Sequence, residues 1–321
     1  EDDFEPGVFR VSDEMLGEEG GPSTRSKVSD SHTALTLFTS GTTGAPKGVE
    51  LSIQAYAANL EIFHSFLDLK PQEPLRVVLV NPLHHANSSS MSSFALRHPG
   101  AQLYLCSHYG TSYWDVLAKV AQGFSGRIVA PLVARHFEYL ENLLNEGRLE
   151  LNEEHRDALE RTEFLVGSAP VGPQTVERFK HLTGRLPKVR FGSTELCLQA
   201  LGIDSRMSEA SVLRAFERGW THEHEAEALV GYYIGRPHEP LTEADVVESV
   251  VWGEPGFMKP VAPGASGFLV VKSASQMTGY VDEPDATRAV LHDGWYLGLG
   301  DVVFYLTNED TGVNDYYWVS R

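Results

Sequence analysis

Between about residue 33 and residue 193, short apolar runs typical of β-strands alternate with amphipathic segments of helical periodicity. The strand-like runs are HTALTLF, LRVVLVN, AQLYLC, RIVAPL, EFLVGSA and KVRFGS, and the clearest helix-like segments are IQAYAANLEIFHSFL, SYWDVLAKVAQGF, RHFEYLENLLNEG and GPQTVERFKHL. This alternation predicts an α/β fold, in which a parallel sheet is covered by helices on both faces and ligands bind at the carboxyl ends of the strands. Glycine-rich stretches at 41–48, 167–172 and 192–195 each follow a predicted strand, so we expect them to gather at that edge.

The pattern divides the chain into three parts. Residues 1–32 are acidic and rich in Gly, Ser and Pro, which predicts a surface segment. Residues 33–224 form the predicted α/β subdomain that holds the glycine-rich stretches, and residues 225–321 contain short β-rich pieces that predict a smaller β-rich subdomain. Because the sequence starts at a glutamate and stops at DYYWVSR without a helix cap or closing turn, we expect it to be a piece of a longer protein.

Charge and composition favour a small-molecule partner. The 321 residues carry a formal net charge of −18, which argues against nucleic acid or an anionic membrane surface as the main partner. Cys106 and Cys197 have no metal-ligand spacing and form no disulfide framework. We find neither a signal peptide nor an apolar run long enough to form an integral membrane segment, so we expect a reducing, cytoplasmic location.

The segment TSGTTGAPKGVE, residues 39–50, has the composition of a phosphate-binding loop. Glycines permit close approach of backbone N–H groups to an anion, hydroxyls donate hydrogen bonds, and a lysine supplies a mobile positive charge. The residues that would do so are Thr39, Ser40, Gly41, Thr42, Thr43, Gly44, Lys47 and Gly48. A Walker-type loop is disfavoured, because Gly48 follows Lys47 where that motif has a hydroxyl for magnesium. A purely structural turn is the alternative.

The string FTSGTTGAPKGV, residues 38–49, matches every position of the signature [FY]-T-S-G-[ST]-T-G-x-P-K-G-V of the adenylate-forming superfamily. This superfamily contains acyl-CoA and aryl-CoA synthetases, adenylation domains of nonribosomal peptide synthetases, and luciferases. Further motifs resemble those of the family in the same order: GSAPVG at 167–172, FGSTE at 191–195, GRPHEP from Gly235, and DGWYLGLGD at 293–301. Taken alone, GSAPVG could equally be an ordinary strand-to-helix turn with Pro173 at the helix start.

The resemblance implies a role for each matching residue. It places Lys47 and the hydroxyl loop on the β- and γ-phosphates of ATP, Thr194 near the α-phosphate, and Glu195 on Mg²⁺. Asp301 and Arg321 would contact the ribose. The adenine would lie against Phe191 and the loop Gly167, Ser168, Ala169 and Pro170, with Gly192 and Ser193 in the same motif as Phe191.

Two histidine-containing segments admit more than one interpretation. NPLHHANSS, residues 81–89, resembles the family's segment beside the carboxylate site, with His85 at the usual histidine. His84 and His85 could instead be structural or bind a metal, although neighbours in a strand point to opposite faces and no third ligand is evident. THEHEAE, residues 221–227, contains a His-x-His that we interpret as part of a solvated acidic surface, with metal binding as the alternative.

Some positions depart from the family pattern. Leu299 replaces the usual Thr, one extra residue lies between Trp295 and Asp301, and Phe268 replaces a common Glu. The C-terminal domain that carries a catalytic lysine in the family is absent from the sequence, as is most of the subdomain that usually precedes the phosphate loop. We therefore expect this chain alone to hold a nucleotide but to be slow or inactive as an enzyme.

The resemblance implies ATP-dependent activation of a carboxylic acid to an acyl-adenylate, with release of pyrophosphate. A thioester with coenzyme A or a carrier-protein thiol would then form in the full protein. The segment at 81–89 lacks the Asp that binds a substrate amino group in peptide synthetases, so an acyl or aryl acid is favoured over an amino acid. The alternative is a degenerate, non-catalytic nucleotide-binding module.

Overall fold

The computed structural model describes residues 8–11, 29–39, 45–224, 227–228, 230–308 and 311–321. The chain forms two compact units, each a mixed α/β structure. The first consists of Glu1–Ser29, Leu69–Ala169 and Gln174–Lys188, and the second of Asp30–Asp68, Pro170–Pro173 and Val189–Arg321. These units do not follow the predicted boundary near residue 225, because residues 30–68 and 189–224 pack with the C-terminal strands.

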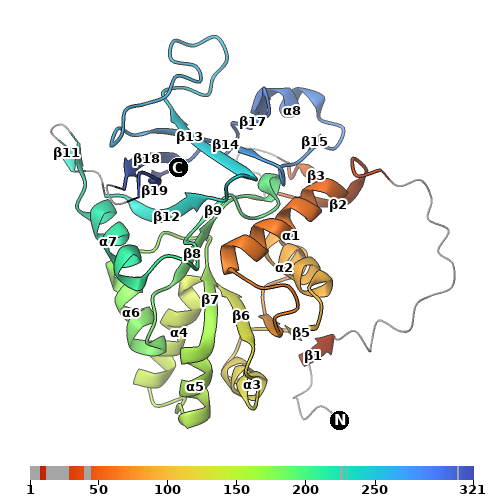
Figure 1. Cartoon of the computed structure of the whole chain (residues 1–321), viewed down its shortest axis with the longest axis vertical. Coiled ribbons are helices and arrows are strands. Elements are labelled where there is room, and N and C mark those ends of the chain that lie inside the picture. Colours follow the sequence, from red (N-terminus) through yellow and green to blue (C-terminus); the bar gives the residue numbers. More distant parts are fainter. Residues whose placement is uncertain (1–7, 12–28, 40–44, 225–226, 229, 309–310) are drawn as a thin grey trace. The chain divides into compact units, whose positions relative to one another are not determined.

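The first unit contains the predicted parallel sheet, with strand order β1-β5-β4-β6-β7 (Figure 1). Its strands are β1 (Val8–Val11), β4 (Leu75–Leu79), β5 (Ala101–Cys106), β6 (Arg127–Leu132) and β7 (Thr162–Val166). Strands β5, β4, β6 and β7 are parallel, and their near-continuous apolar runs are buried. β1 pairs antiparallel with β5, so part of the predicted N-terminal surface segment is in fact an edge strand that provides the outer hydrogen bonds of β5.

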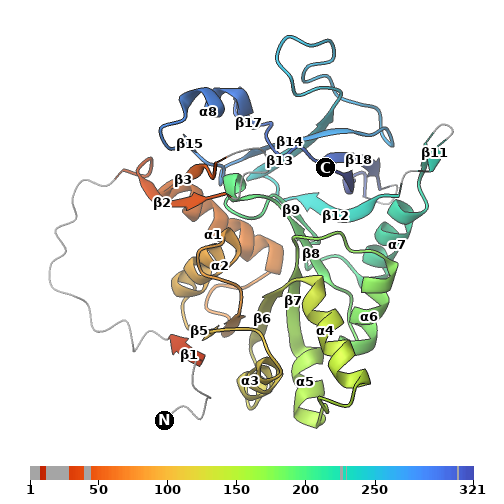
Figure 2. The same cartoon turned by 180° about the vertical axis from the view of Figure 1, so that it is seen from behind.

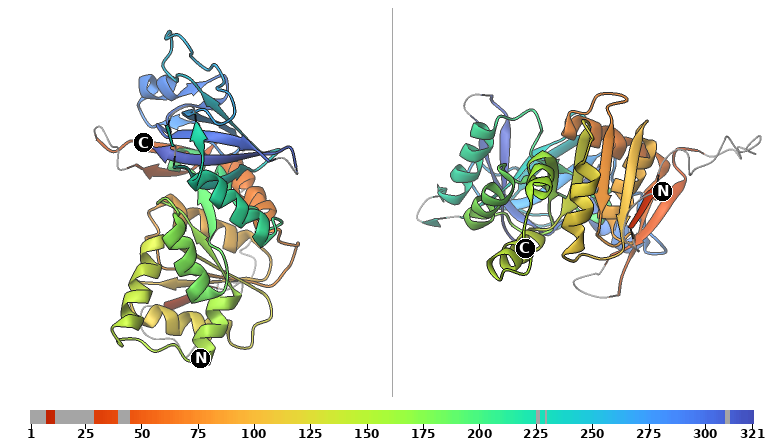
Figure 3. Two further views of the ribbon diagram at one scale, coloured as in Figure 1. Left: turned by 90° about the vertical axis from the view of Figure 1, so that its left-hand side faces the viewer. Right: turned by 90° about the horizontal axis from the view of Figure 1, so that it is seen from below.

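Helices connect these parallel strands, and Figure 3 shows them from the side and from below. They are α2 (Ala86–Arg97), α3 (Ser112–Ala121), α4 (Ala134–Asn145), α5 (Glu153–Arg161) and α6 (Pro173–Thr183). The chain steps from β4 to β5 in one direction and from β5 to β6 and β7 in the other. Because crossovers of this type are right-handed, α2 covers one face and α3 and α5, which pack together, cover the other.

The second unit is mainly antiparallel sheet (Figure 2). Its main strands, in sheet order, are β8 (Lys188–Phe191), β9 (Leu201–Gly202), β12 (Tyr232–Pro237), β19 (Asn314–Ser320), β18 (Val302–Thr307), β14 (Gly267–Ser273), β17 (Trp295–Tyr296) and β16 (Leu291–His292), with β13 (Thr242–Val247) on β14. β10 (Glu223–His224) pairs with β11 (Glu227–Ala228). The helices are α1 (Ile53–Leu67), α7 (Glu209–Trp220) and α8 (Pro284–Val290), and the 3₁₀ turn η2 lies at Thr194–Leu196.

A separate three-stranded sheet carries the glycine-rich segment. Its order is β15 (Gly279–Tyr280), β3 (Gly48–Ser52) and β2 (Thr33–Phe38), and both pairings are antiparallel. The prediction that the stretch at 41–48 follows a strand of the parallel sheet is therefore wrong. A short apolar run does not by itself distinguish a parallel strand from one arm of a hairpin, and β2 uses its ladder to pair with β3.

Local signals explain which predicted elements are confirmed. α1 and β6 have the predicted bounds, and α1 is bounded by Ser52, whose side chain accepts from Ala55 N, and by Asp68 in the left-handed conformation (φ 48°). The Ser-rich segment ANSSSMSSFALR, residues 86–97, forms helix α2. Helices α5, α7 and α8 were not predicted, although α5 begins at an Asn152 cap followed by two glutamates, an ordinary helix-start signal.

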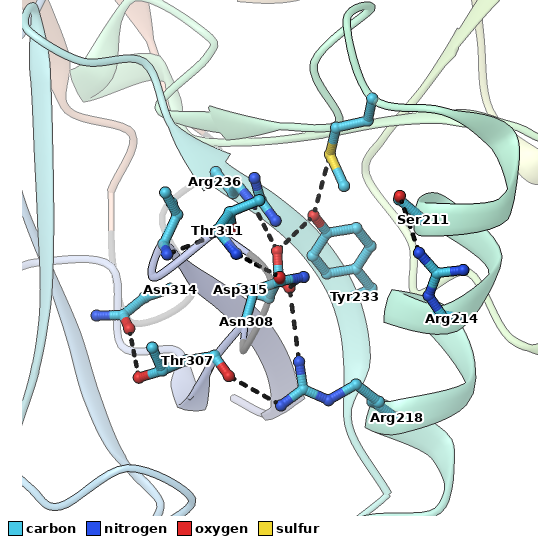
Figure 4. Close-up of polar contacts among 12 residues, drawn as sticks. Ser211, Arg214, Arg218, Tyr233, Arg236, Thr307, Asn308, Thr311, Asn314 and Asp315 are labelled. Carbon is cyan, nitrogen blue, oxygen red and sulfur yellow. Dashed lines mark hydrogen bonds and ion pairs between the residues drawn. The ribbon is translucent and has the colours of Figure 1, made fainter.

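A buried carboxylate joins several elements of the second unit (Figure 4). Asp315, on β19, has no exposed surface. Its Oδ1 accepts from Tyr233 Oη at 2.9 Å and from Arg236 Nε at 2.7 Å, both on β12. Its Oδ2 lies 3.4 Å from Asn308 Nδ2 and 3.9 Å from Arg218 Nη1 of α7. Each carboxylate oxygen of Asp315 thus has two donor groups beside it, and the arginines neutralise its negative charge within the fold.

Candidate nucleotide-binding site

The glycine-rich segment is closed at its base by the β2–β3 hairpin. Thr39 N donates to Lys47 O at 3.0 Å, directly beyond the last paired residues, Phe38 and Gly48. Five of the predicted phosphate-binding residues lie outside the described residues, namely Ser40, Gly41, Thr42, Thr43 and Gly44. The half-buried Lys47 places its Nζ 5.2 Å from the centroid of the Tyr280 ring, within the range of a cation–π contact.

The FGSTE motif forms a tight turn at the end of β8. Phe191 is the last residue of the strand and is partly buried, and a Cβ at Gly192 would lie 2.1 Å from Leu198 O, so only glycine fits there. Thr194, partly exposed, starts η2. The turn then continues through Cys197 (φ 52°) and Leu198 (φ 87°), two successive non-glycine residues with positive φ. Such conformations persist only where surrounding contacts enforce them, and they are common at functional sites.

Two distant segments, residues 275–277 and helix α1, enforce this turn by binding three consecutive carbonyls. The Glu195 carbonyl accepts from Met277 N at 2.6 Å, and the Leu196 carbonyl accepts from Ser275 Oγ at 3.0 Å. The Cys197 carbonyl accepts from the side chain of Asn59, on α1, at 2.7 Å. The backbone that carries Glu195 is therefore anchored from two sides, and no sequence motif indicated any of these three partners.

The Glu195 carboxylate is nearly buried and lies among phenols. Tyr280 Oη donates to Glu195 Oε1 at 2.9 Å, and Tyr296 hydrogen-bonds in the same cluster. Burial, followed by the negative charge of Glu195, raises the pKa of both tyrosines well above the ordinary value, so both remain protonated donors. None of the described residues forms an ion pair with Glu195. Its negative charge is therefore hydrogen-bonded but not neutralised by a side chain.

A single carboxylate of this kind fits a cation whose remaining ligands are supplied by a bound substrate and water. No group of three or more His, Cys, Asp or Glu residues that could hold a metal occurs in the described part of the chain. Carboxylate oxygens have the hard donor character that Mg²⁺ prefers, and Mg²⁺ is commonly held by one or two carboxylates together with substrate phosphates and water. Glu195 therefore fits Mg²⁺ bound to a polyphosphate and does not fit a metal held by protein ligands alone.

Asp301 and Arg321 are brought together by the β18–β19 hairpin. Asp301 directly precedes β18 and Arg321 directly follows β19, and the pairing sets Val302 opposite Ser320. Trp318 Nε1 donates to Asp301 Oδ1 at 2.8 Å, a contact that the sequence analysis did not predict. Burial raises the pKa of Asp301, while the Trp318 hydrogen bond and the charge of Arg321 act in the opposite direction. The predicted pair thus lies together at one end of this hairpin.

The remaining candidates lie at the ends of strands in the first unit. His85 is the exposed N-cap residue of α2, and its ring lies 4.6 Å from that of His84. The segment is a turn into a helix, so the argument that the two rings point to opposite faces of a strand is wrong. Gly167, Ser168 and Ala169 follow β7 in a loop, with Ser168 in a left-handed conformation (φ 66°). Pro170, next in sequence, groups with the second unit.

Two further motifs are structural in the described residues. The GRPHEP motif begins inside a strand, because Gly235 and Arg236 lie within β12, and a Cβ at Gly235 would lie 2.1 Å from Gly202 C. In the segment at 221–227, His222 stacks on Phe304 at 4.4 Å and its Nε2 lies 2.9 Å from Gly264 O. His222 is therefore packed against β18 rather than part of a solvated surface. None of the helices described is both long and apolar enough to cross a membrane.

Comparison with known proteins identifies the same family as the motifs. The profile described as "AMP-binding enzyme" matches residues 4–281. Among curated proteins, the chain is 29% identical over 272 residues to a sulfoacetate–CoA ligase of Cupriavidus necator, covering 84% of this chain and 44% of that protein. It is also 29% identical over 272 residues to a long-chain-fatty-acid–CoA ligase of Salmonella typhimurium, covering 84% and 41%. The chain thus spans less than half the length of these relatives.

A solved structure shares the fold. The ATP-bound structure of MatB from Rhodopseudomonas palustris aligns with a TM-score of 0.67 at 21% identity, covering 91% of this chain and 49% of that one. At this identity the likeness concerns the fold alone.

Proposed function

This chain belongs to the AMP-binding enzyme family, and on that premise we propose that its nucleotide site activates a carboxylic acid with ATP. One oxygen of the acid attacks the α-phosphorus of ATP, and the bond from that phosphorus to the bridging oxygen of the β-phosphate breaks. The products are an acyl-adenylate and pyrophosphate. In the whole protein, a thiol of coenzyme A or of a carrier protein would then displace AMP to give a thioester. The names of the curated CoA ligases quoted above support this acceptor.

The observation that carries the proposal is the arrangement around Glu195. An anchored turn presents a carboxylate without an ion-pair partner among the described residues, and Tyr280 connects this carboxylate to the half-buried Lys47 of the phosphate loop. A polyphosphate with Mg²⁺ supplies what both groups need, because its anionic oxygens can accept from Lys47 and its cation can bind Glu195. When bound, Mg²⁺ would neutralise negative charge on the phosphates.

Each of the other candidate residues has a proposed task. Thr194 donates its hydroxyl to the α-phosphate, and Lys47 with the hydroxyls of Thr39 and its loop binds the β- and γ-phosphates. The ring of Phe191 and the loop at 167–170 contact the adenine, and Asp301 accepts hydrogen bonds from the ribose hydroxyls beside Arg321. His85 would lie beside the acid. These tasks amount to positioning and charge stabilisation, which supply most of the acceleration in phosphoryl-type transfers.

The experiment is ATP–pyrophosphate exchange with radiolabelled pyrophosphate and the longest natural form of the protein, across panels of fatty, aryl and amino acids. We expect one class of acid to stimulate exchange, and we expect Glu195→Gln to abolish this stimulation while the protein remains folded. We also expect the 321-residue chain alone to bind ATP but to exchange slowly.

A different result would change the assignment. Exchange with none of the acids, combined with an increase in unfolding temperature on addition of MgATP, would support the non-catalytic nucleotide-binding module instead. Normal turnover by the 321-residue chain would contradict the expectation that the isolated chain is slow.

A further inference from the structure

Tyr280 lies where the phosphate loop meets the turn that carries Glu195. It is one of the two residues of β15, and it pairs with Val49 of β3, two residues beyond Lys47. Its ring lies beneath Lys47 Nζ, and its hydroxyl donates to Glu195 Oε1 at 2.9 Å. One side chain, 8% exposed, therefore contacts the two charged groups to which ATP phosphates and Mg²⁺ are assigned above.

The backbone around Tyr280 fixes this position. Met277 N donates to the Glu195 carbonyl, while Thr278 N and Val281 N donate to Glu50 O at 2.9 Å and Gly48 O at 2.8 Å. Tyr280 N itself donates to Thr287 Oγ1 at 2.9 Å. Residues 277–281 therefore bridge β3 and η2, so any shift of the Glu195 turn relative to the phosphate loop must break several hydrogen bonds.

We propose that Tyr280 is a positioning residue, which holds the Glu195 carboxylate for the cation and aligns it with Lys47. This inference rests on the proposed function. A hydrogen bond from a neutral phenol fixes the orientation of a carboxylate without neutralising its charge, whereas an arginine or lysine in the same place would compete with the metal. Each carboxylate oxygen has two lone pairs, so Glu195 Oε1 can accept from Tyr280 and capacity remains for the metal. The ring face meanwhile holds Lys47 at the base of the loop.

A purely structural role for the hydroxyl is the competing explanation, and the two roles predict different results. A buried tyrosine that only stabilises the fold would lower stability when its hydroxyl is removed, but it would not alter the requirement for Mg²⁺. Tyr316 provides the matched control, because its hydroxyl donates to Ala244 O at 2.8 Å within the same unit and contacts neither Glu195 nor Lys47.

The experiment is a calorimetric titration of the 321-residue chain with ATP at graded concentrations of free Mg²⁺ and in EDTA. The variants are Tyr280→Phe, Tyr316→Phe, Glu195→Gln and the double variant Tyr280→Phe/Glu195→Gln. Tyr280→Phe keeps the ring for Lys47, so affinity for ATP in EDTA should be unchanged. The Mg²⁺ concentration for half-maximal enhancement of ATP binding should rise by about tenfold, as for other residues that orient metal ligands.

Tyr316→Phe should leave the Mg²⁺ requirement at the wild-type value, and Tyr280→Phe should have no further effect once Glu195→Gln is present. Equal Mg²⁺ curves for Tyr280→Phe and the wild type would overturn the positioning role while leaving the proposed function intact. If Mg²⁺ fails to enhance ATP binding to the wild type, both are overturned. Should Tyr280→Phe fold poorly, Tyr296→Phe tests the same phenol cluster and should raise the Mg²⁺ requirement in the same direction.

Discussion

Asp315 and Glu195 are both buried carboxylates of the second unit, but their surroundings differ. Asp315 has no exposed surface, and two arginines, a tyrosine and an asparagine surround it. Glu195 retains 9% of its surface and lies beside phenols, with Lys47 Nζ over the ring of Tyr280. The first carboxylate is neutralised inside the protein, and the second keeps its charge.

This difference separates a structural carboxylate from one suited to bind a ligand. Burying a charge is unfavourable unless a counter-charge and hydrogen bonds compensate for it, and Asp315 has both. Burial lowers the pKa of Arg236, but its hydrogen bond to Asp315 and the Asp315 charge outweigh that effect, and the net shift is upward. Glu195 is held by hydrogen bonds and has no ion-pair partner among the described residues, which is the arrangement that the proposed Mg²⁺ would complete. The predictions below test this contrast.

The largest expected effect on stability is at Asp315. Asp315→Asn keeps the shape of the side chain but leaves Arg236 and Arg218 without their counter-charge, so it should lower the free energy of unfolding by about 3 kcal/mol. Urea denaturation followed by circular dichroism measures this value. ATP affinity of the folded variant should stay at the wild-type value, and a selective loss of ATP binding without destabilisation would contradict the structural role of Asp315.

Glu195→Gln should weaken Mg²⁺-dependent ATP binding and leave stability nearly unchanged, which is the opposite of the result expected for Asp315→Asn. The amide oxygen can still accept from Tyr280, so the free energy of unfolding should change by no more than about 1 kcal/mol. The enhancement of ATP binding by Mg²⁺ should fall by about 10- to 100-fold, because the variant lacks the anionic ligand. Urea denaturation and calorimetric titration on the same samples test both statements. A large loss of stability would show that Glu195, like Asp315, is paired within the fold.

Asn59→Ala tests the anchoring of the turn. Removing the donor to the buried Cys197 carbonyl should lower the free energy of unfolding by about 2 kcal/mol and weaken Mg²⁺-dependent ATP binding, because the turn at 195–198 loses a restraint. The control is Thr183→Val, which removes a buried hydroxyl that donates to Phe179 O within α6 of the first unit. The control should lose stability without any change in ATP binding. Equal ATP affinities in both variants would exclude a link between Asn59 and the site.

The smallest expected effect concerns pH and Asp301. Burial raises the pKa of Asp301 in the folded state above its unfolded value. An acid shifted in this direction favours folding fully below its unfolded pKa, and that contribution is lost as the pH rises through the folded pKa. Asp301→Asn should therefore be more stable than the wild type at about pH 7, by less than about 1 kcal/mol, and the difference should shrink towards acid pH.

Urea denaturation curves of the Asp301→Asn and wild-type proteins, recorded from about pH 7 down to acid pH, measure the difference in their free energies of unfolding. ATP affinity of the wild type should fall as Asp301 becomes protonated, whereas the ATP affinity of Asp301→Asn should be low throughout. A stability difference that grows on acidification would contradict the direction of the shift.

Much of the fold could be predicted from local sequence. The bounds of α1 and β6 follow from hydrophobic periodicity and flanking turn residues. The parallel direction of strands β4, β5, β6 and β7 follows from strand–helix alternation. The site motifs were likewise readable, because the phosphate loop and FGSTE are short, contiguous strings. The structure adds that Asp301 and Arg321 lie together, which follows once β18 and β19 are paired.

What the sequence by itself determined was therefore local: the fold class, the family, and which residues are candidates for the chemistry. Only the tertiary structure decided that β15 adds a third strand to the β2–β3 hairpin, that Asn59 binds the Cys197 carbonyl, and that Tyr280 binds Glu195 across 85 positions. The physical reason is that periodicity and capping depend on neighbours within a few residues. Pairing between distant segments depends instead on which buried polar groups meet when the whole chain packs, and a single sequence does not specify that locally.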